Sequence, residues 1–316
     1  MSMYITFPSW IQPEVFSNLP IRWYSLMYLV AFAFAYILFR YQRNKGLIAI
    51  DDESMYSLFL YAIVGLIVGA RLFSTLFYDG SMYYWTHPHM IFWPFRGGHF
   101  VGLPGMSYHG GLVGAVIGAL IFSKQYKQNF LDIADVMVAA VPLGYTFGRL
   151  GNFINGELWG RVSTVKWAIV FPDAPRFSTN YGWVRDIANT IGMEFQSGQL
   201  LNLPRHPSQL YEALFEGIVL WLFMWFIIKP RKKFPGYNLS WYLIGYGGVR
   251  FLIEYLREPD SQLGFIISWG KESEPIALFH SLFNISMGQV LCLLMIIAGV
   301  VGLLLGKKKH KGALHG

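Results

Sequence analysis

Long apolar runs, each followed by a short polar or basic stretch, dominate this chain. A helix crosses the hydrocarbon core of a bilayer with about 20 residues, so we interpret these runs as membrane-spanning helices. We expect seven of them, at residues 21–39, 56–77, 108–124, 131–147, 214–228, 239–256 and 287–305. The pattern therefore predicts an all-α integral membrane protein with seven transmembrane helices.

The positions of the basic residues predict the orientation of these helices. Lysines and arginines follow the first, third, fifth and seventh runs, and the chain ends in the cluster Lys307, Lys308, Lys309 and Lys311. Such clusters mark cytoplasmic loops, so we expect the N-terminus outside and the C-terminus inside. The first twenty residues lack the basic region of a secretory signal peptide, and we expect the first helix to remain as an anchor.

Three regions follow from this topology. Residues 1–161 would hold helices one to four, with an outer arm at about 78–107 that is rich in aromatic residues. Residues 162–204 form the longest expected extramembrane segment, which predicts a small mixed extracytoplasmic head, or cap, with a strand near 165–171. Residues 205–316 would hold helices five to seven and a basic cytoplasmic tail.

Composition supports the membrane class and excludes several others. Hydrophobic residues make up 54% of the 316 positions and charged residues 14%, whereas soluble domains carry about 25% charged residues. The net charge of +7 could suggest nucleic acid, but basic residues at helix ends indicate lipid headgroups instead, so we expect no nucleic-acid partner. The single cysteine, Cys292, lies in an apolar run and suits packing.

The stretch 148–161 brings charged and amide groups directly after an apolar run. It contains Arg149, Asn152, Asn155 and Glu157. An unpaired charge at membrane depth costs about 2.5–3.5 kcal/mol or more, so such groups must face something polar. We interpret the stretch as the lining of a site for a polar or anionic ligand held in the membrane. The alternative is a glycine-rich helix end whose charges reach water.

A second polar face lies on the sixth expected helix. Tyr246, Arg250 and Glu254 follow one another at steps of four residues and therefore share one face. A guanidinium suits bidentate capture of a phosphate, which makes Arg250 a candidate ligand-binding residue. The alternative is an internal Arg250–Glu254 ion pair that only locks helices together.

Other polar residues at helix ends are weaker candidates. His109 opens the third helix, where an imidazole could act as a base or form a structural hydrogen bond. Arg71 near the outer end of the second helix is either functional or reaches the surface. Tyr24 lies in an aromatic cluster that could be a membrane-interface belt or could turn its hydroxyl inward. The spacing of His87, His89 and His99 matches no metal-ligand pattern.

Three local features predict structure rather than chemistry. Gly65-x-x-x-Gly69 permits close helix contact. Pro142 should kink the fourth helix. Ser208 is a candidate N-cap of the fifth helix.

The motifs together resemble the prolipoprotein diacylglyceryl transferase family of the bacterial inner membrane. The most specific is Gly-Arg-Leu-Gly-Asn-Phe-Ile-Asn-Gly-Glu-Leu-Trp-Gly-Arg at 148–161, supported by Trp23-Tyr24, by Ser-Tyr-His-Gly-Gly at 107–111 and by Arg-His-Pro-Ser-Gln-Leu-Tyr-Glu at 205–212. Two features depart from the family pattern. Gly69-Ala70 precedes Arg71 where Gly-Gly is expected, and residues 264–283 form a longer link than usual.

The resemblance implies an activity and places residues in it. It implies transfer of a diacylglyceryl group from phosphatidylglycerol to the lipobox cysteine of a preprolipoprotein, on the extracytoplasmic side, with no cofactor and no metal. The family's essential histidine falls on His109 and its essential arginines on Arg149 and Arg250. Its other important residues fall on Tyr24, Asn152, Gly160, Tyr246 and Glu254.

On this basis we form a mechanistic hypothesis. His109 would accept the thiol proton, and Arg149 and Arg250 would bind the phosphate. Asn152, Asn155 and Tyr246 would orient the headgroup, and Glu157 and Glu254 would hold the arginines.

Two rival classes use similar residues. A transporter or flippase for anionic lipid would use the arginines without chemistry, but the halves show no internal repeat. A metal-dependent phospholipid synthase would need an acidic cluster, which Asp132 and Asp135 alone do not form.

Overall fold

The structure, a computed structural model, describes residues 4–16, 19–103, 105–259, 264–269 and 275–314. The chain divides into two compact units. The larger unit comprises Met1–Tyr41 and Ala134–Gly316, and the smaller unit comprises Gln42–Ile133. Residues 270–274, which belong to the long link expected at 264–283, lie outside the described residues.

Four helical stretches are long and apolar enough to cross a membrane among the described residues. They are Trp23–Asn44 (α1), Asp52–Tyr78 (α2, Asp52–Phe73, with a π-helical end), Ser208–Arg231 and Met287–His310. A fifth forms if α5 (Phe130–Val138) and α6 (Val141–Ile154), bent by 51°, count as one span. The bend at Pro142 was predicted. The protein is thus a multi-span helical membrane protein.

Two of the expected spans are helical but short. The third corresponds to α4 (Tyr108–Gln125) with 18 residues, and the sixth to α10 (Tyr237–Ile253) with 17 residues. A helix needs about 20 apolar residues to cross the hydrocarbon core, so helix length alone does not establish these two as spans. The seven-span count and the orientation remain predictions.

Glycines hold α2 and α4 of the smaller unit at close range. A Cβ atom added at Gly65 would collide with the backbone of Gly114, and one at Gly69 would collide with the backbone of Gly110. Only glycine permits such backbone approach, so the close contact predicted for Gly65-x-x-x-Gly69 is confirmed.

The arm, residues 78–107 of the smaller unit, folds from short elements. These are α3 (Tyr83–Thr86), a 3₁₀ turn at Pro88–Ile91 and the antiparallel pair β4 (Phe95–Arg96) and β5 (His99–Phe100). Arg71 of α2 is 2% exposed and donates to the carbonyl oxygens of Ile91 and Gly105, while its guanidinium lies 5.5 Å from the ring centre of Tyr84. These contacts of Arg71 hold the arm against α2.

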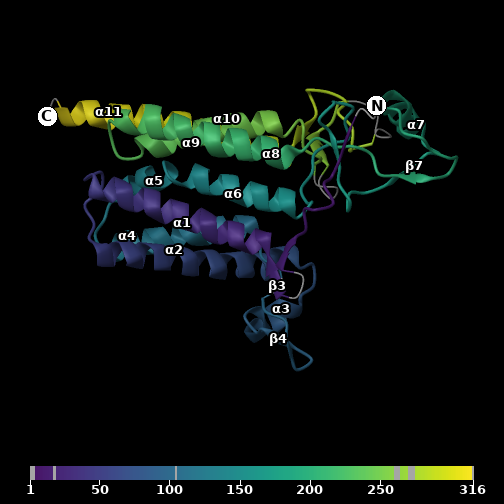
Figure 1. Cartoon of the computed structure of the whole chain (residues 1–316). Coiled ribbons are helices and arrows are strands. Elements are labelled where there is room, and N and C mark those ends of the chain that lie inside the picture. Colours follow the sequence, from purple (N-terminus) through teal and green to yellow (C-terminus); the bar gives the residue numbers. More distant parts are fainter. Residues whose placement is uncertain (1–3, 17–18, 104, 260–263, 270–274, 315–316) are drawn as a thin grey trace. The chain divides into compact units, whose positions relative to one another are not determined.

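Helix pairs build the larger unit. Residues Ser208–Arg231 form one helical rod through α8 (Ser208–Glu212), α9 (Leu220–Leu222) and intervening π turns. Helices α10 and α11 (Met287–Leu314) run side by side (Figure 1), and a Cβ atom at Gly247 would lie 2.9 Å from the carbonyl oxygen of Cys292. The packing role of Cys292 agrees with its burial.

The start of α8 differs from the prediction. Pro207 occupies the N-cap position, and Ser208 is the first helical residue. The Ser208 hydroxyl donates to the carbonyl oxygen of Leu158 at 3.0 Å instead of capping the helix. The N-cap prediction was wrong because the helix begins at Ser208 itself, so that Pro207 takes the N-cap position.

Residues 162–204 form a small mixed region of the larger unit (Figure 1). It contains β6 (Ile169–Val170), β7 (Phe177–Ser178), α7 (Gly182–Ile191) and β8 (Leu200–Leu201). The expected strand at 165–171 exists only as β6, which pairs in parallel with β1 (Ile5–Thr6). The apolar side of α7, with Val184 and Ala188, packs on Leu201 and Leu203.

The remaining strands form short antiparallel pairs. They are β2 (Glu14–Phe16) with β3 (Leu19–Arg22), β7 with β8, and β9 (Phe265–Ile267) with β10 (Ile285–Ser286).

Candidate active site

Two arginines from different helices converge on one glutamate. Arg149 lies in α6 and Arg250 lies near the end of α10. Arg149 Nε is 2.8 Å and Arg250 Nη1 is 3.2 Å from the same atom, Oε2 of Glu212 at the end of α8. The two arginine side chains are 16% and 14% exposed, whereas the glutamate side chain is 1% exposed. The sequence thus correctly suggested that both arginines face polar groups.

Arg149 and Arg250 also contact a second pair of polar side chains. Tyr145, one turn before Arg149, donates to Glu216 Oε2 at 2.6 Å and accepts from Arg149 Nε at 2.7 Å. Arg250 Nη1 lies 3.4 Å from Glu216 Oε1. The Tyr246 ring stands edge-on to the Tyr145 ring with 6.1 Å between centres. These contacts hold both arginine side chains in place.

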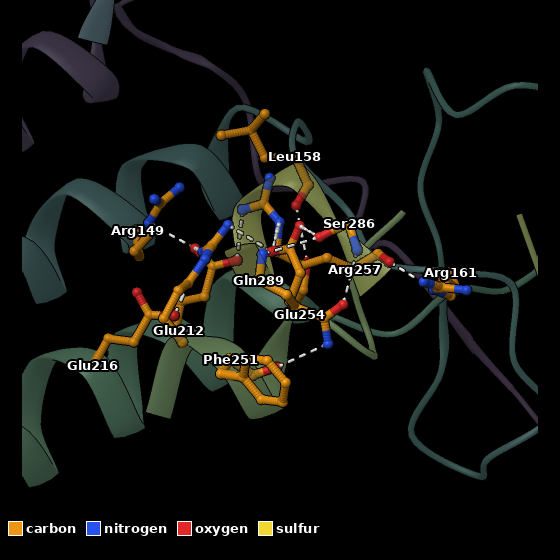
Figure 2. A network of polar contacts seen from close by, with 12 residues as sticks. Arg149, Leu158, Arg161, Glu212, Glu216, Phe251, Glu254, Arg257, Ser286 and Gln289 are labelled. Atoms are coloured by element: carbon orange, nitrogen blue, oxygen red, sulfur yellow. Dashed lines mark hydrogen bonds and ion pairs between the residues drawn. The ribbon is translucent and has the colours of Figure 1, made fainter. Parts of the chain in front are cut away.

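Glu254 and Arg257 extend the network toward α11. Arg250 Nη2 lies 3.0 Å from Glu254 Oε2, which is the internal ion pair anticipated as an alternative. Arg257 Nη1 donates to Glu212 Oε1 at 2.8 Å, and Ser286 donates to Glu254 Oε1 at 3.1 Å. Figure 2 shows this network. Because Arg250 also contacts Glu212 and Glu216, its pairing with Glu254 is only one of its contacts.

The charges of the network balance. Among the described residues, the ion pairs link three arginines and three glutamates: Arg149, Arg250, Arg257, Glu212, Glu216 and Glu254. None of these side chains is more than 17% exposed. Buried charges persist in apolar surroundings only when they are paired and hydrogen-bonded. The network is therefore neutral and preorganised.

Residues 152–160 tie the end of α6 to the network. Asn152 accepts from Arg149 Nη1 at 3.3 Å and donates to Glu157 Oε1 at 2.8 Å. Glu157 thus acts on Arg149 through Asn152. Gln209 donates its side-chain amide to the Glu157 carbonyl oxygen at 2.5 Å. The predicted grouping of Arg149, Asn152 and Glu157 is present.

Gly160 has a packing role in this connection. Its N–H donates to the carbonyl oxygen of His206 at 2.8 Å, and it forms an isolated antiparallel bridge with Arg257. A Cβ atom at Gly160 would collide with the carbonyl oxygen of Leu256 and lie 2.8 Å from the His206 Cβ. Any larger residue would separate the segment from the end of α10.

Two further arginines support the network from outside the spans. Arg161 is 3% exposed, and its Nε donates to the Arg257 carbonyl oxygen at 2.7 Å. Arg205 is fully buried, pairs with Glu258 and lies with its guanidinium 5.5 Å from the ring centre of Phe177. Burial lowers the pKa of both, and the Glu258 carboxylate opposes this shift at Arg205. Both arginines anchor the 160–206 region.

His206 directly follows Arg205, and its pKa is lower than that of a free histidine. Burial lowers its pKa, and the positive charge of Arg161 lowers it further. Its Nδ1 lies 3.2 Å from the hydroxyl of Tyr211. The neutral imidazole is therefore the form that this environment favours.

Four predicted site residues lie outside the network of the larger unit. Asn155 lines a separate cavity of about 480 Å³ together with the N-terminal segment. The Tyr24 hydroxyl of α1 forms a hydrogen bond with the Tyr28 hydroxyl at 2.8 Å. His109 and Arg71 belong to the smaller unit, where the His109 Nδ1 lies 3.1 Å from the exposed Tyr78 hydroxyl.

Sequence reasoning missed the carboxylates that pair with the arginines. Glu212 and Glu216 lie four residues apart on one face of an otherwise apolar helical stretch, and Tyr145 precedes Arg149 by the same step. Two acids inside a membrane helix are the same kind of signal that drew attention to Arg250. In the part of the chain that the structure describes, no three histidine, cysteine, aspartate or glutamate side chains gather as metal ligands.

Comparison with known proteins gives a consistent result. A family model described as prolipoprotein diacylglyceryl transferase matches residues 13–305. A Treponema pallidum protein named phosphatidylglycerol--prolipoprotein diacylglyceryl transferase is 46% identical over 322 residues, which cover 97% of this chain and 96% of that protein.

Relatives with the same name extend the match to other bacteria. The Treponema denticola protein is 47% identical over 323 residues, covering 96% of this chain and 95% of that protein. The Chlorobaculum tepidum protein is 41% identical over 312 residues, covering 97% and 93%. The matched regions include the stretch 148–161 and the whole Arg149–Arg250 network. This chain belongs to the prolipoprotein diacylglyceryl transferase family.

Proposed function

We propose that this protein transfers the diacylglyceryl group of phosphatidylglycerol to the lipobox cysteine thiol of preprolipoproteins. A thioether forms and glycerol phosphate is released, which is the first step of lipoprotein maturation. The names of the relatives support the reaction. The observation that carries the proposal is the convergence of Arg149 and Arg250, from two helices, on a single anionic oxygen.

The reaction needs stabilisation of a growing negative charge. The thiolate sulfur attacks the diacylglyceryl carbon that bears the phosphate ester, so a carbon–sulfur bond forms and a carbon–oxygen bond breaks. The electron pair of the broken bond remains on the phosphate oxygen. Arg149 and Arg250 bind the phosphate and stabilise this charge, each contributing on the order of 3–4 kcal/mol to the transition state. Asn152 and Tyr246 orient the headgroup beside them.

His109 is the proposed base that accepts the thiol proton. Imidazole takes up a proton near neutral pH, and a thiolate is far more nucleophilic than a thiol. The Tyr78 hydroxyl beside Nδ1 supports the role, because a partner at one ring nitrogen orients the other. Arg71, whose contacts hold the arm to α2, supports the smaller unit that carries His109.

The remaining assignments concern location. We place the reaction at the extracytoplasmic face of the bacterial inner membrane, in a seven-span protein with its N-terminus outside. The basic clusters after alternate apolar runs support this orientation. Residues 162–204 form the extracytoplasmic head, and Tyr24, Gly160 and Asn155 lie in segments that border the substrates.

The test uses purified protein in vesicles of phosphatidylglycerol with a peptide that carries a lipobox cysteine. We expect release of one glycerol phosphate for each peptide converted to a thioether, unchanged in chelator. A flippase would move lipid across the vesicle without releasing glycerol phosphate, and that outcome would refute the proposal. Loss of the product in chelator would instead favour a metal-dependent enzyme.

A further inference from the structure

We infer that Glu212 competes with the substrate phosphate for the position between Arg149 and Arg250, so that lipid enters and product leaves by exchange with its carboxylate. The inference rests on the proposed function and adds a positioning residue to it. Glu212 acts through Arg149 and Arg250, whose guanidinium groups both contact its carboxylate.

The inference depends on the position of one atom, Oε2 of Glu212. Glu212 Oε2 lies 2.8 Å from Arg149 Nε and 3.2 Å from Arg250 Nη1. A phosphate oxygen that bridges two guanidinium groups needs the same two donors at the same distances. Among the ion pairs of the described residues, Glu212 is the carboxylate that contacts all three arginines, Arg149, Arg250 and Arg257. The phosphate and Oε2 therefore compete for one position.

A second contact makes the exchange feasible. Glu212 Oε1 accepts from Arg257 Nη1 at 2.8 Å. When a phosphate displaces Oε2, this bond keeps the carboxylate paired, and the large cost of an unpaired buried charge is avoided. Arg149 and Arg250 keep some exposed surface, whereas Glu212 is almost fully buried, so an incoming anion meets the arginines first.

Exchange has a consequence for product release. Phosphatidylglycerol carries one negative charge on its phosphate, but the free glycerol phosphate monoester carries up to two near neutral pH. Bound only to arginines, the product would be held more tightly than the substrate. The returning Glu212 carboxylate competes with it and adds like-charge repulsion, which favours release.

A purely structural role for Glu212 predicts something different. If Glu212 only locked α8 to α6 and α10, its removal would loosen both arginines and weaken the binding of every anion. If it is a competitor, removal of its charge tightens anion binding. The direction of the change therefore distinguishes the two roles.

The experiment measures glycerol phosphate binding to the detergent-purified protein by calorimetry. For Glu212→Gln we expect the Kd to fall by about tenfold or more. We also expect a lower KM for phosphatidylglycerol together with a lower kcat, because product release slows. Glu194→Gln is the matched control: it removes one exposed carboxylate from the same unit, and it should leave the Kd unchanged.

A second variant keeps the inference testable if Glu212→Gln does not fold. Glu212→Asp keeps the charge but shortens the side chain by one methylene, which withdraws the carboxylate from the position between Arg149 and Arg250, so it should also tighten glycerol phosphate binding. Unchanged or weaker binding in the folded variants would overturn the inference. If the wild-type protein released no glycerol phosphate from phosphatidylglycerol, the proposed function itself would fail, whatever the binding results.

Discussion

Nε of Arg149 lies 2.8 Å from Oε2 of Glu212, although the two residues belong to separate helices. Arg250 Nη1 lies 3.2 Å from the same oxygen, so two guanidinium groups point at one anionic position. Such preorganisation removes the cost of orienting charges during the reaction. The arrangement supports the proposal that the substrate is a lipid with a phosphodiester.

The two arginines should not tolerate replacement by lysine. Lysine keeps the charge but lacks the planar group that contacts two partners at once. For Arg149→Lys or Arg250→Lys we expect kcat to fall by about 10²–10³-fold, the loss associated with one transition-state donor. The measurement is the initial rate of glycerol phosphate release. Arg40→Lys, at an exposed position of α1, is the control and should retain the wild-type rate.

The Tyr78–His109 contact predicts that both side chains affect the rate. Loss of the hydroxyl 3.1 Å from Nδ1 should loosen the orientation of the imidazole, so Tyr78→Phe should lower the rate of glycerol phosphate release. His109→Asn should lower the rate by about 10²–10⁴-fold, the range for a lost general base. Tyr181→Phe, at an exposed tyrosine, provides the control. An unchanged rate for His109→Asn would argue against His109 as the base.

Two glycines of the same motif should respond in opposite ways to alanine. Gly160→Ala places a Cβ against the Leu256 carbonyl oxygen, and we expect a loss of about 1–3 kcal/mol of stability from overpacking. Gly148 lies in α6 with no atom near the position of an added Cβ, and Gly148→Ala should stabilise by about 0.4–1 kcal/mol. Unfolding midpoints in detergent test both. Equal midpoints for the two variants would contradict the close packing of Gly160.

The depressed pKa of His206 predicts a stability change at acidic pH. Above the ordinary histidine pKa of about 6.5 the imidazole is neutral in both states, and its contribution is independent of pH. Below that value the unfolded chain binds the proton first, so stability falls until the pH reaches the lower pKa of the folded state. His206→Gln should remove this component of the pH dependence. His99→Gln, at an exposed histidine, should retain it.

Local pattern predicted much of the helical framework. The apolar runs located α1, α2 and α11, the spacing of Gly65 and Gly69 predicted a close helix contact, and Pro142 predicted the bend before α6. These features depend on residues a few positions apart. The number of membrane crossings depends on helix length as well, and the short α4 and α10 show why composition alone does not establish it.

The site was predicted less completely, for a physical reason. Charged residues inside apolar runs must find partners, so Arg149 and Arg250 could be recognised from the sequence. Their common partner, Glu212, could not be recognised from the sequence. It is 63 positions from Arg149, and only tertiary packing brings the two residues together. Arg71 shows the same limit: its partners are backbone carbonyl oxygens of Ile91 and Gly105, which leave no signature in the sequence.

We propose that Arg149 and Arg250 bind one lipid phosphate at the position between them that Glu212 Oε2 occupies. The most direct measurement is an experimental structure of the protein with phosphatidylglycerol bound. We expect a phosphate oxygen at hydrogen-bond distance, about 3 Å, from both guanidinium groups, with Glu212 retained by Arg257 alone. A phosphate bound elsewhere, with the Glu212 carboxylate still bridging the two arginines, would contradict the account.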